Sequence, residues 1–202
     1  MRMNLFILPA AILALSVPVR ATEVDYGVQL GLAIPSGDLS TFVNNNVGAE
    51  LGFSVQIDLG GGQQLRPRLT GTALTGDTYR LATVSFTREA SLGFLGLDYL
   101  WYPQGNTRRG AYLLGGIGYS ANDLTIDTTS YAAFGPGQIE VKASSSHFAY
   151  TAGAGYQFNR RWAIEARYNG TQWTYDSAAT GHLSSTLSTT SLVGTFRFGG
   201  NR

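Results

Sequence analysis

The chain has 202 residues, within the range of one domain, and only 13% of them are charged, well below the ~25% that is usual for soluble domains. The formal net charge of +1 gives no reason to expect a nucleic-acid partner or a strongly acidic ligand. Cysteine is absent, which excludes a disulfide scaffold, a thiolate metal site and the acceptor cysteine of a lipoprotein.

Residues 1–21 have the pattern of a secretory signal peptide. Arg2 supplies a positive charge, and the apolar run 5–17 is too short to span a bilayer as a helix. Val19 and Ala21 fit the −3 and −1 positions of a cleavage site, so residues 22–202 are expected to form the mature domain. A short N-terminal anchor helix is the alternative. No later segment approaches the ~20 apolar residues of a transmembrane helix, so any spanning must be done by strands.

After residue 21 the dominant hydrophobic period is two, which is the period of β-strands. In the first run, for example, Val24, Tyr26 and Val28 alternate with Asp25 and Gly27. Eight such runs are predicted to be strands, each near the ~10 residues that a tilted membrane strand needs. They are residues 24–34, 47–59, 65–73, 92–102, 111–120, 147–158, 160–175 and 186–198.

The connections between the predicted strands alternate between short and long. Three are tight turns, "GGGQQ", "PQGNTRRG" and "NRR". The others are polar loops near residues 35–46, 75–90, 120–146 and 174–185. Short turns at one end and long loops at the other are typical of an up-and-down barrel with both termini at the short-turn end.

The size of the barrel decides which face points outward. An eight-stranded barrel has an interior just wide enough for side chains to fill, and about four or five large apolar residues per strand do not fit inside it. The opposite face is mostly Gly, Ala, Ser and Thr with a few charges, and does fit. The sequence therefore predicts an all-β fold: an eight-stranded antiparallel up-and-down transmembrane β-barrel with a lipid-facing apolar exterior and a polar, plugged lumen. A soluble lipocalin-like barrel is the alternative.

Charged residues on the predicted inner face have nearly balanced signs. They form a candidate lumen polar network of Asp25, Glu50, Asp58, Arg66, Arg68, Asp98, Glu165, Arg167 and Arg197. The strand order predicts three ion pairs: Asp58–Arg66, Arg68–Asp98 and Asp25–Arg197. Paired, hydrogen-bonded charges are tolerated in a narrow lumen, whereas unpaired ones are costly. A plug that fixes the register is one interpretation, and a gated polar pathway for ions or small solutes is the other.

Aromatic side chains gather beside the short turns, where amphipathic rings suit a bilayer interface. The predicted aromatic belt consists of Tyr99, Trp101, Tyr102, Tyr156, Phe158 and Trp162.

The segments "LGLDYLWY" (95–102), "WAIEARYNG" (162–170) and "LVGTFRF" (192–198) resemble small bacterial outer-membrane barrels of the OmpA-transmembrane and OmpX type. The resemblance implies a place in the lipid of a Gram-negative outer membrane, with both termini in the periplasm and the long loops outside. It also implies that Phe196 and Phe198 are part of the signal read by the barrel-assembly machinery.

Three functions remain open from the sequence. The first is a non-enzymatic envelope-structural or surface-interaction protein that binds through its long loops. Its partners would be an extracellular protein or saccharide rather than a polyanion, because Arg80, Arg88 and Lys142 are the only clear cations in those loops. The second is a narrow porin-like channel or carrier for small solutes. No cofactor or metal is expected, since no ligands stand at recognisable spacing.

The third and weaker alternative is a lipid A-modifying enzyme. Only two histidines are present. Strand alternation points His147 into the lumen, away from membrane substrates. His182 and Ser184 resemble the HxS of PagL-type lipid A deacylases, but no carboxylate follows and the surrounding motif is missing. No catalytic residue is therefore predicted.

Overall fold

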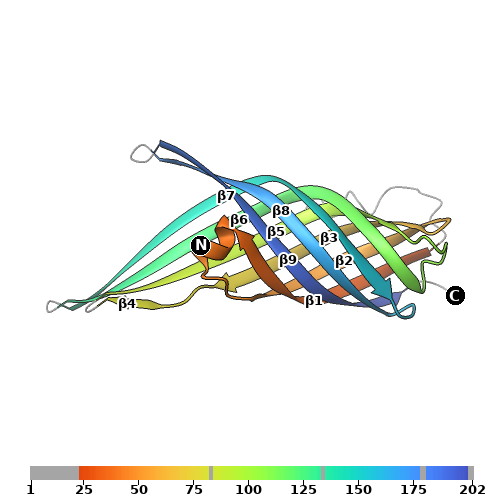
Figure 1. The fold of residues 1–202 in the computed structure, drawn as a ribbon, viewed down its shortest axis with the longest axis horizontal. Helices are drawn as coiled ribbons and strands as arrows, with labels where there is room; N and C mark the ends of the chain where they lie inside the picture. The colour runs from red at the N-terminus through yellow and green to blue at the C-terminus, as the bar shows by residue number, and fades with distance from the viewer. Residues whose placement is uncertain (1–22, 82–83, 133–134, 178–180, 200–202) are drawn as a thin grey trace.

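The fold comes from a computed structural model that describes residues 23–81, 84–132, 135–177 and 181–199 (Figure 1). The predicted signal peptide, residues 1–21, lies outside the described residues. Within the described ranges, no helix has the length and apolar character needed to cross a membrane.

One sheet contains almost every described residue. Its strands are β1 (Glu23–Gly37), β2 (Gly48–Gly60), β3 (Gln63–Thr75), β4 (Tyr79–Leu81), β5 (Val84–Trp101), β6 (Gly110–Ala132), β7 (Gly135–Gln157), β8 (Trp162–Ser177) and β9 (Gly181–Gly199). A short helix, α2 (Asp38–Phe42), follows β1.

The sheet closes into a ring of eight antiparallel strands. Neighbours follow the order β3-β2-β1-β9-β8-β7-β6-β5, and β3 pairs with β5 to complete the ring. The ninth strand, β4, pairs only with the first residues of β5, beyond the point where β3 ends. Closure leaves no open edge within the ring, which is what a strand protein in hydrocarbon requires. The predicted eight-stranded up-and-down barrel is confirmed.

The apolar faces of the strands point outward. Leu30, Ile117 and Ile164 are 67%, 59% and 39% exposed, whereas Arg68 and Glu165 are buried inside the ring. A soluble barrel would show the reverse arrangement, because its apolar face would fill the core. The predicted orientation, with an apolar exterior and a polar interior, is therefore confirmed.

The predicted long loops are largely strands, and this corrects the sequence analysis. Most of 120–146 belongs to β6 and β7, which pair without interruption from Gly110–Gln157 to Ala132–Gly135. Most of 174–185 likewise belongs to β8 and β9. The physical reason is that "LTIDTTS" and "IEVKASS" are rich in β-branched residues, which favour strands even where both faces meet water.

Beyond the ring the sheet divides into two arms. Pairing between β7 and β8 stops at Ala149–Thr171, although both strands continue. The long arm comprises residues 123–132 and 135–148, with β4 and the start of β5 alongside. The short arm comprises residues 172–177 and 181–186. The two arms point in different directions in Figure 1, with the blue β8–β9 tip on one side and the β6–β7 tip on the other.

Helix α2 closes the barrel at the end that carries the arms. Its Leu39 is fully buried, and so is Val43 just after it. These two residues pack with Leu74, Ala90 and Leu187 on the inner face of the ring. This apolar cap lies where the chain leaves β1, in the segment predicted as a long polar loop.

Candidate functional site

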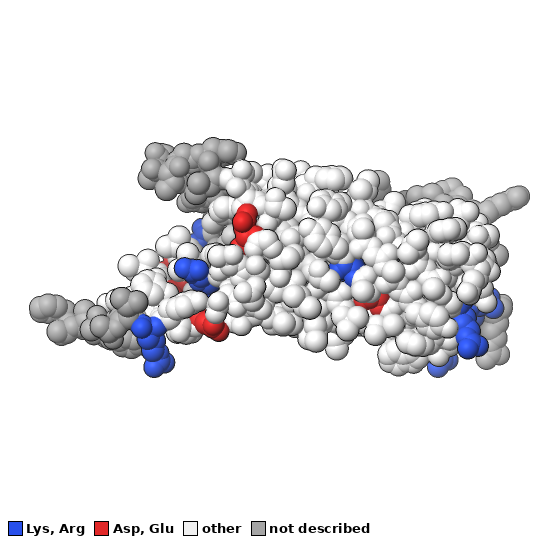
Figure 2. Space-filling model, in the orientation of Figure 1, with Lys and Arg blue, Asp and Glu red and all other residues white. Residues whose placement is uncertain are grey.

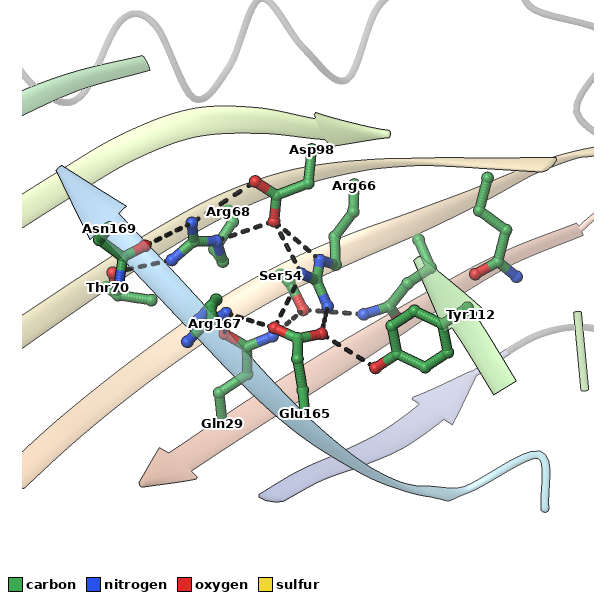
Figure 3. A network of polar contacts seen from close by, with 12 residues as sticks. Gln29, Ser54, Arg66, Arg68, Thr70, Asp98, Tyr112, Glu165, Arg167 and Asn169 are labelled. Carbon is green, nitrogen blue, oxygen red and sulfur yellow. Dashed lines mark hydrogen bonds and ion pairs between the residues drawn. The ribbon is translucent and has the colours of Figure 1, made fainter. Parts of the chain in front are cut away.

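Arg66 is the centre of the polar network that fills the lumen (Figure 3). Its Nη1 donates to Glu165 Oε2 at 2.6 Å, and its Nε and Nη2 donate to Asp98 Oδ2 at 3.0 and 2.8 Å. All three side chains are completely buried. A planar guanidinium between two carboxylates donates several hydrogen bonds at once. Such bonds offset the free energy lost when the charges are removed from water.

The network crosses the full width of the barrel. Arg66 lies on β3 and Glu165 on β8, and these strands are four places apart in the ring in either direction. Arg167 on β8 pairs with Glu165 at 2.9 Å and also with Glu50 on β2. Opposite walls are thus tied together through the lumen.

Arg68 occupies the side of the network nearest the cap. Its Nε donates to Asp98 Oδ2 at 2.9 Å, as the strand order predicts. The guanidinium also lies 4.2 Å from the centre of the Phe94 ring, a cation–π contact. We use the name lumen network for the charges joined in this way: Glu50, Arg66, Arg68, Asp98, Glu165 and Arg167. Three positive charges are balanced by three negative ones.

Neutral groups complete the lumen network. Tyr112 donates its hydroxyl to Glu165 Oε2 at 2.9 Å, Ser191 donates to Glu50 Oε2 at 2.5 Å, and Gln29 accepts from Arg167 Nη1 at 3.2 Å. Sequence reasoning did not select these three residues. Strand alternation places Gln29 and Ser191 on the inner face, but it does not show which inner residues meet across the barrel.

Two predicted ion pairs are wrong. Asp58 lies opposite Gln64 rather than Arg66, because β2 and β3 keep one register from Ala49–Ala73 to Asp58–Gln64, and an irregularity between Asp58 and Gly60 offsets that register from the glycine turn. Its carboxylate accepts instead from Thr107 Oγ1 at 2.7 Å. Asp25 lies opposite Gly199, and its nearest cation is Arg160 at 3.6 Å.

Arg197, the predicted partner of Asp25, has a different contact. Its Nη2 donates to the Tyr102 hydroxyl at 3.2 Å. Asp25, Asp58 and Arg197 therefore stand apart from the lumen network, at the short-turn end of the barrel, where they line a shared small pocket.

Tyr102 does not belong to the aromatic belt. It is 1% exposed and its ring packs on Tyr112, with 4.9 Å between centroids. The reason is alternation itself: Trp101 points outward, so its neighbour must point inward. Tyr102, Tyr112, Leu100 and Leu114 form a buried cluster below the lumen network.

The other rings of the predicted belt are all exposed on the outer face near the short turns. They are Tyr99, Trp101, Tyr156, Phe158 and Trp162. Phe196 and Phe198 lie on the same outer face, and the Phe196 ring packs on Trp162 with 4.8 Å between centroids. The proposed role of these two phenylalanines in assembly stays a prediction.

Little free space remains inside the ring. Between the lumen network and the apolar cap lies a cavity of about 30 Å³, bordered by Thr70, Asn169, Thr171, Leu187 and Ser188. A cavity of that size holds only one or two water molecules. The lumen is therefore plugged by charges in the middle and by apolar side chains at the arm end.

Outside the barrel, the loop after β3 is tied to the segment after α2. Asn46 donates to Asp77 Oδ1 at 3.0 Å and to the Thr75 carbonyl at 3.1 Å, and Asn44 also donates to Asp77. These hydrogen bonds lower the pKa of the Asp77 carboxyl below its usual value, and the bond from Asn46 has the largest effect. Asn44 adopts φ 55°, a left-handed conformation that asparagine accepts more readily than most residues.

The residues considered for catalysis do not form a site in the described ranges. His147 Nε2 is 2.7 Å from Thr174 Oγ1, at the fork where β7 and β8 separate. The side chain of His182 lies outside the described residues. Among the described parts of the chain, no cluster of three or more His, Cys, Asp or Glu side chains is arranged to hold a metal ion.

Comparison with known families agrees with this geometry. The sequence pattern of the outer membrane protein beta-barrel domain family matches residues 6–196. The chain belongs to this family. Membership places it in the outer membrane. No curated protein sequence matches it.

Solved structures of outer-membrane barrels share the fold at low sequence identity. Ail of Yersinia pestis, in complex with the heparin analogue sucrose octasulfate, is 15% identical with a TM-score of 0.56, covering 87% of this chain and 99% of Ail. A major outer membrane protein of Thermus thermophilus is 14% identical with a TM-score of 0.50, covering 87% of this chain and 99% of that one. At these identities the similarity is one of fold alone.

Proposed function

We propose that this outer-membrane barrel is a non-enzymatic surface-interaction protein. Its two arms would extend from the outer surface of the cell and bind an extracellular protein or an uncharged saccharide. Both termini and the short turns would face the periplasm. The observation that carries the proposal is the contrast between a plugged lumen and a sheet that continues far past the ring.

The length of the arms supports a role outside the membrane. Only nine residue pairs join β7 to β8, which matches the ~9–11 residues that a tilted strand needs to cross a bilayer. β7 continues for fourteen more residues, from Gly135 to Phe148, paired with β6 but not with β8. Among the described residues that side of β7 has no strand partner, and an open strand edge is a template for hydrogen bonding to another extended chain.

The charge of the arms favours some partners over others. The cations of this region are Arg80, Arg88 and Lys142. Its acidic residues outnumber them: Asp38, Asp77, Glu89, Asp123, Asp127, Glu140 and Asp176. Ail shares this fold and its structure holds a sulfated sugar, but the acidic excess here opposes a polyanion. A neutral glycan or a basic protein surface is the better match.

Shortening the long arm is expected to abolish binding while leaving the barrel intact. The variant deletes residues 125–142 and joins Leu124 to Ala143 through Asn-Gly. These two residues already face each other, and Asn-Gly suits a two-residue hairpin turn. Arrays of neutral glycans, heparin and secreted proteins would be probed with the folded protein in lipid nanodiscs. We expect at least a tenfold loss of signal on the neutral glycan or protein spots that the unaltered chain binds.

The control is Arg109→Gln, an exposed change in a turn at the opposite end of the barrel. It should bind as the unaltered chain does. Equal binding by the shortened variant, or binding of the unaltered chain to heparin alone, would contradict the proposal.

The channel alternative has its own test. Because the lumen network and the apolar cap both fill the lumen, the protein in planar bilayers should carry no steady ion current. Reproducible open steps at neutral pH would favour the narrow channel instead.

A further inference from the structure

A hollow of about 440 Å³ opens at the short-turn end of the barrel, where β9 ends beside the β7–β8 turn. Its volume is within the range of small-molecule sites. Arg160, Arg161 and Arg197 line it on the polar side, with Asp25, while Phe196 and Phe198 line it on the apolar side. Figure 2 shows blue side chains gathered at this end of the molecule. The hollow is separate from the lumen network and from the arms.

Arg197 is the distinctive residue of this hollow. It is 2% exposed, yet no carboxylate oxygen among the described residues lies within 4.0 Å of its guanidinium. Its Nη2 donates to a neutral hydroxyl, that of Tyr102, and its Nε has no hydrogen-bond partner in the described ranges. Asp25 lines the same hollow and its charge interacts with Arg197, but its direct ion pair is with Arg160. A buried guanidinium without a directly hydrogen-bonded anion is costly. The group is therefore placed to accept an anionic ligand.

Arg161 extends the positive surface outward. Its carbonyl accepts a hydrogen bond from the backbone N–H of Arg197 at 2.7 Å, which holds the two arginines side by side. Its side chain is exposed and forms no ion pair with another described residue. Arg160 is different, because Glu23 and Asp25 already pair with it. Arg161 is thus open to a ligand that arrives from outside, whereas Arg197 lines the hollow from its buried side.

The apolar side of the hollow is continuous with the aromatic belt. Phe196 packs on Trp162, and Phe198 packs on Tyr26 with 6.0 Å between centroids. Cations beside lipid-facing rings match a molecule whose anionic head adjoins apolar chains. A phospholipid phosphate has this chemistry, and an inorganic phosphate has the anionic part alone.

We propose that Arg161 and Arg197 bind the phosphate of an anionic phospholipid headgroup in the hollow at the end of β9, with the acyl chains against Phe196 and Phe198. That this lipid belongs to the periplasmic leaflet rests on the orientation proposed above. The binding itself does not depend on that orientation.

Native mass spectrometry of the folded protein, released from nanodiscs of equal phosphatidylglycerol and phosphatidylethanolamine, tests the site. The unaltered chain should retain phosphatidylglycerol preferentially. Arg161→Gln should reduce the retained fraction about fivefold, the effect of removing one arginine beside a charged headgroup. Arg197→Gln should reduce it further. The matched control, Arg80→Gln in β4 at the other end of the molecule, should leave retention unchanged.

Arg161 is exposed, so its replacement leaves the barrel folded, which heat-dependent gel migration verifies. A second experiment repeats the measurement in millimolar inorganic phosphate. If phosphatidylglycerol stays bound in the presence of phosphate, the lipid is the ligand. If phosphate displaces it, free phosphate binds the site as well as the lipid does. Equal retention of the two lipids, or equal loss in Arg161→Gln and Arg80→Gln, overturns the proposal. The variant with the shortened long arm should retain phosphatidylglycerol as the unaltered chain does. A failure of the surface-interaction proposal would therefore leave this test unaffected.

Discussion

Ile117→Arg is expected to lower the free energy of unfolding in a bilayer by about 2–4 kcal/mol, the cost of an arginine on the lipid face near the midplane. Ile117 is 59% exposed and lies near the middle of the part of β6 that belongs to the ring. In water an exposed isoleucine could be replaced at almost no cost. The large loss expected here arises because acyl chains, and not water, surround this side chain.

The matched control is Ile139→Arg. Ile139 is 65% exposed and lies on β7, the partner strand of β6, but far along the long arm. Its replacement should change the free energy by less than ~0.5 kcal/mol. Reversible denaturant unfolding of both variants in phospholipid vesicles gives the comparison. Similar small losses at both positions would show that the ring does not cross a bilayer in the orientation described.

Glu165→Gln is expected to destabilise the barrel by about 3 kcal/mol, because it leaves the buried lumen network with one uncompensated positive charge, although Arg66 keeps Asp98 and Arg167 keeps Glu50. The side chain accepts from both Arg66 and Arg167 and is completely buried. The control is Asp123→Asn, which breaks the half-exposed pair with Lys142 on the long arm. Exposed pairs contribute at most ~1 kcal/mol. The same unfolding measurement in vesicles applies to both.

A second replacement distinguishes an electrostatic cause from a loss of packing. Adding Arg66→Gln to Glu165→Gln removes one charge of each sign and leaves the Arg68–Asp98 and Arg167–Glu50 pairs in place. If charge balance in the lumen is what matters, the double variant should be more stable than Glu165→Gln alone. Simple addition of two losses would instead indicate that these side chains act mainly by filling space.

Together the two predictions address the two environments that the barrel separates. The outer face is stabilised by contact with lipid, so its sensitivity depends on depth in the membrane. The inner face is stabilised by ion pairs that meet no water, so its sensitivity depends on charge balance. Both differ from a soluble barrel, in which the apolar core would carry most of the stability.

The amino-acid sequence by itself determined the strand count of the ring and the inward and outward faces. Both follow from local facts: alternation has a period of two along a single strand, and a narrow barrel accepts only the smaller, polar face inside. Even the error at Tyr102 shows this, because strict alternation from Trp101 gives the inward position that the structure shows. The outer-membrane location came from the resemblance to a family and from the family match, not from periodicity.

Only the tertiary structure decided which inner residues meet. Arg66 and Glu165 are 99 residues apart in the chain and lie on opposite walls, and no strand pattern reports a distance across the lumen. The same holds for the apolar cap, where α2 packs against residues of β3, β5 and β9. It also holds for Arg197, which makes no direct ion pair with a described residue because the register sets Asp25 opposite Gly199. Periodicity is a property of one strand, whereas these contacts depend on how the ring closes and on how far each pair of strands stays together.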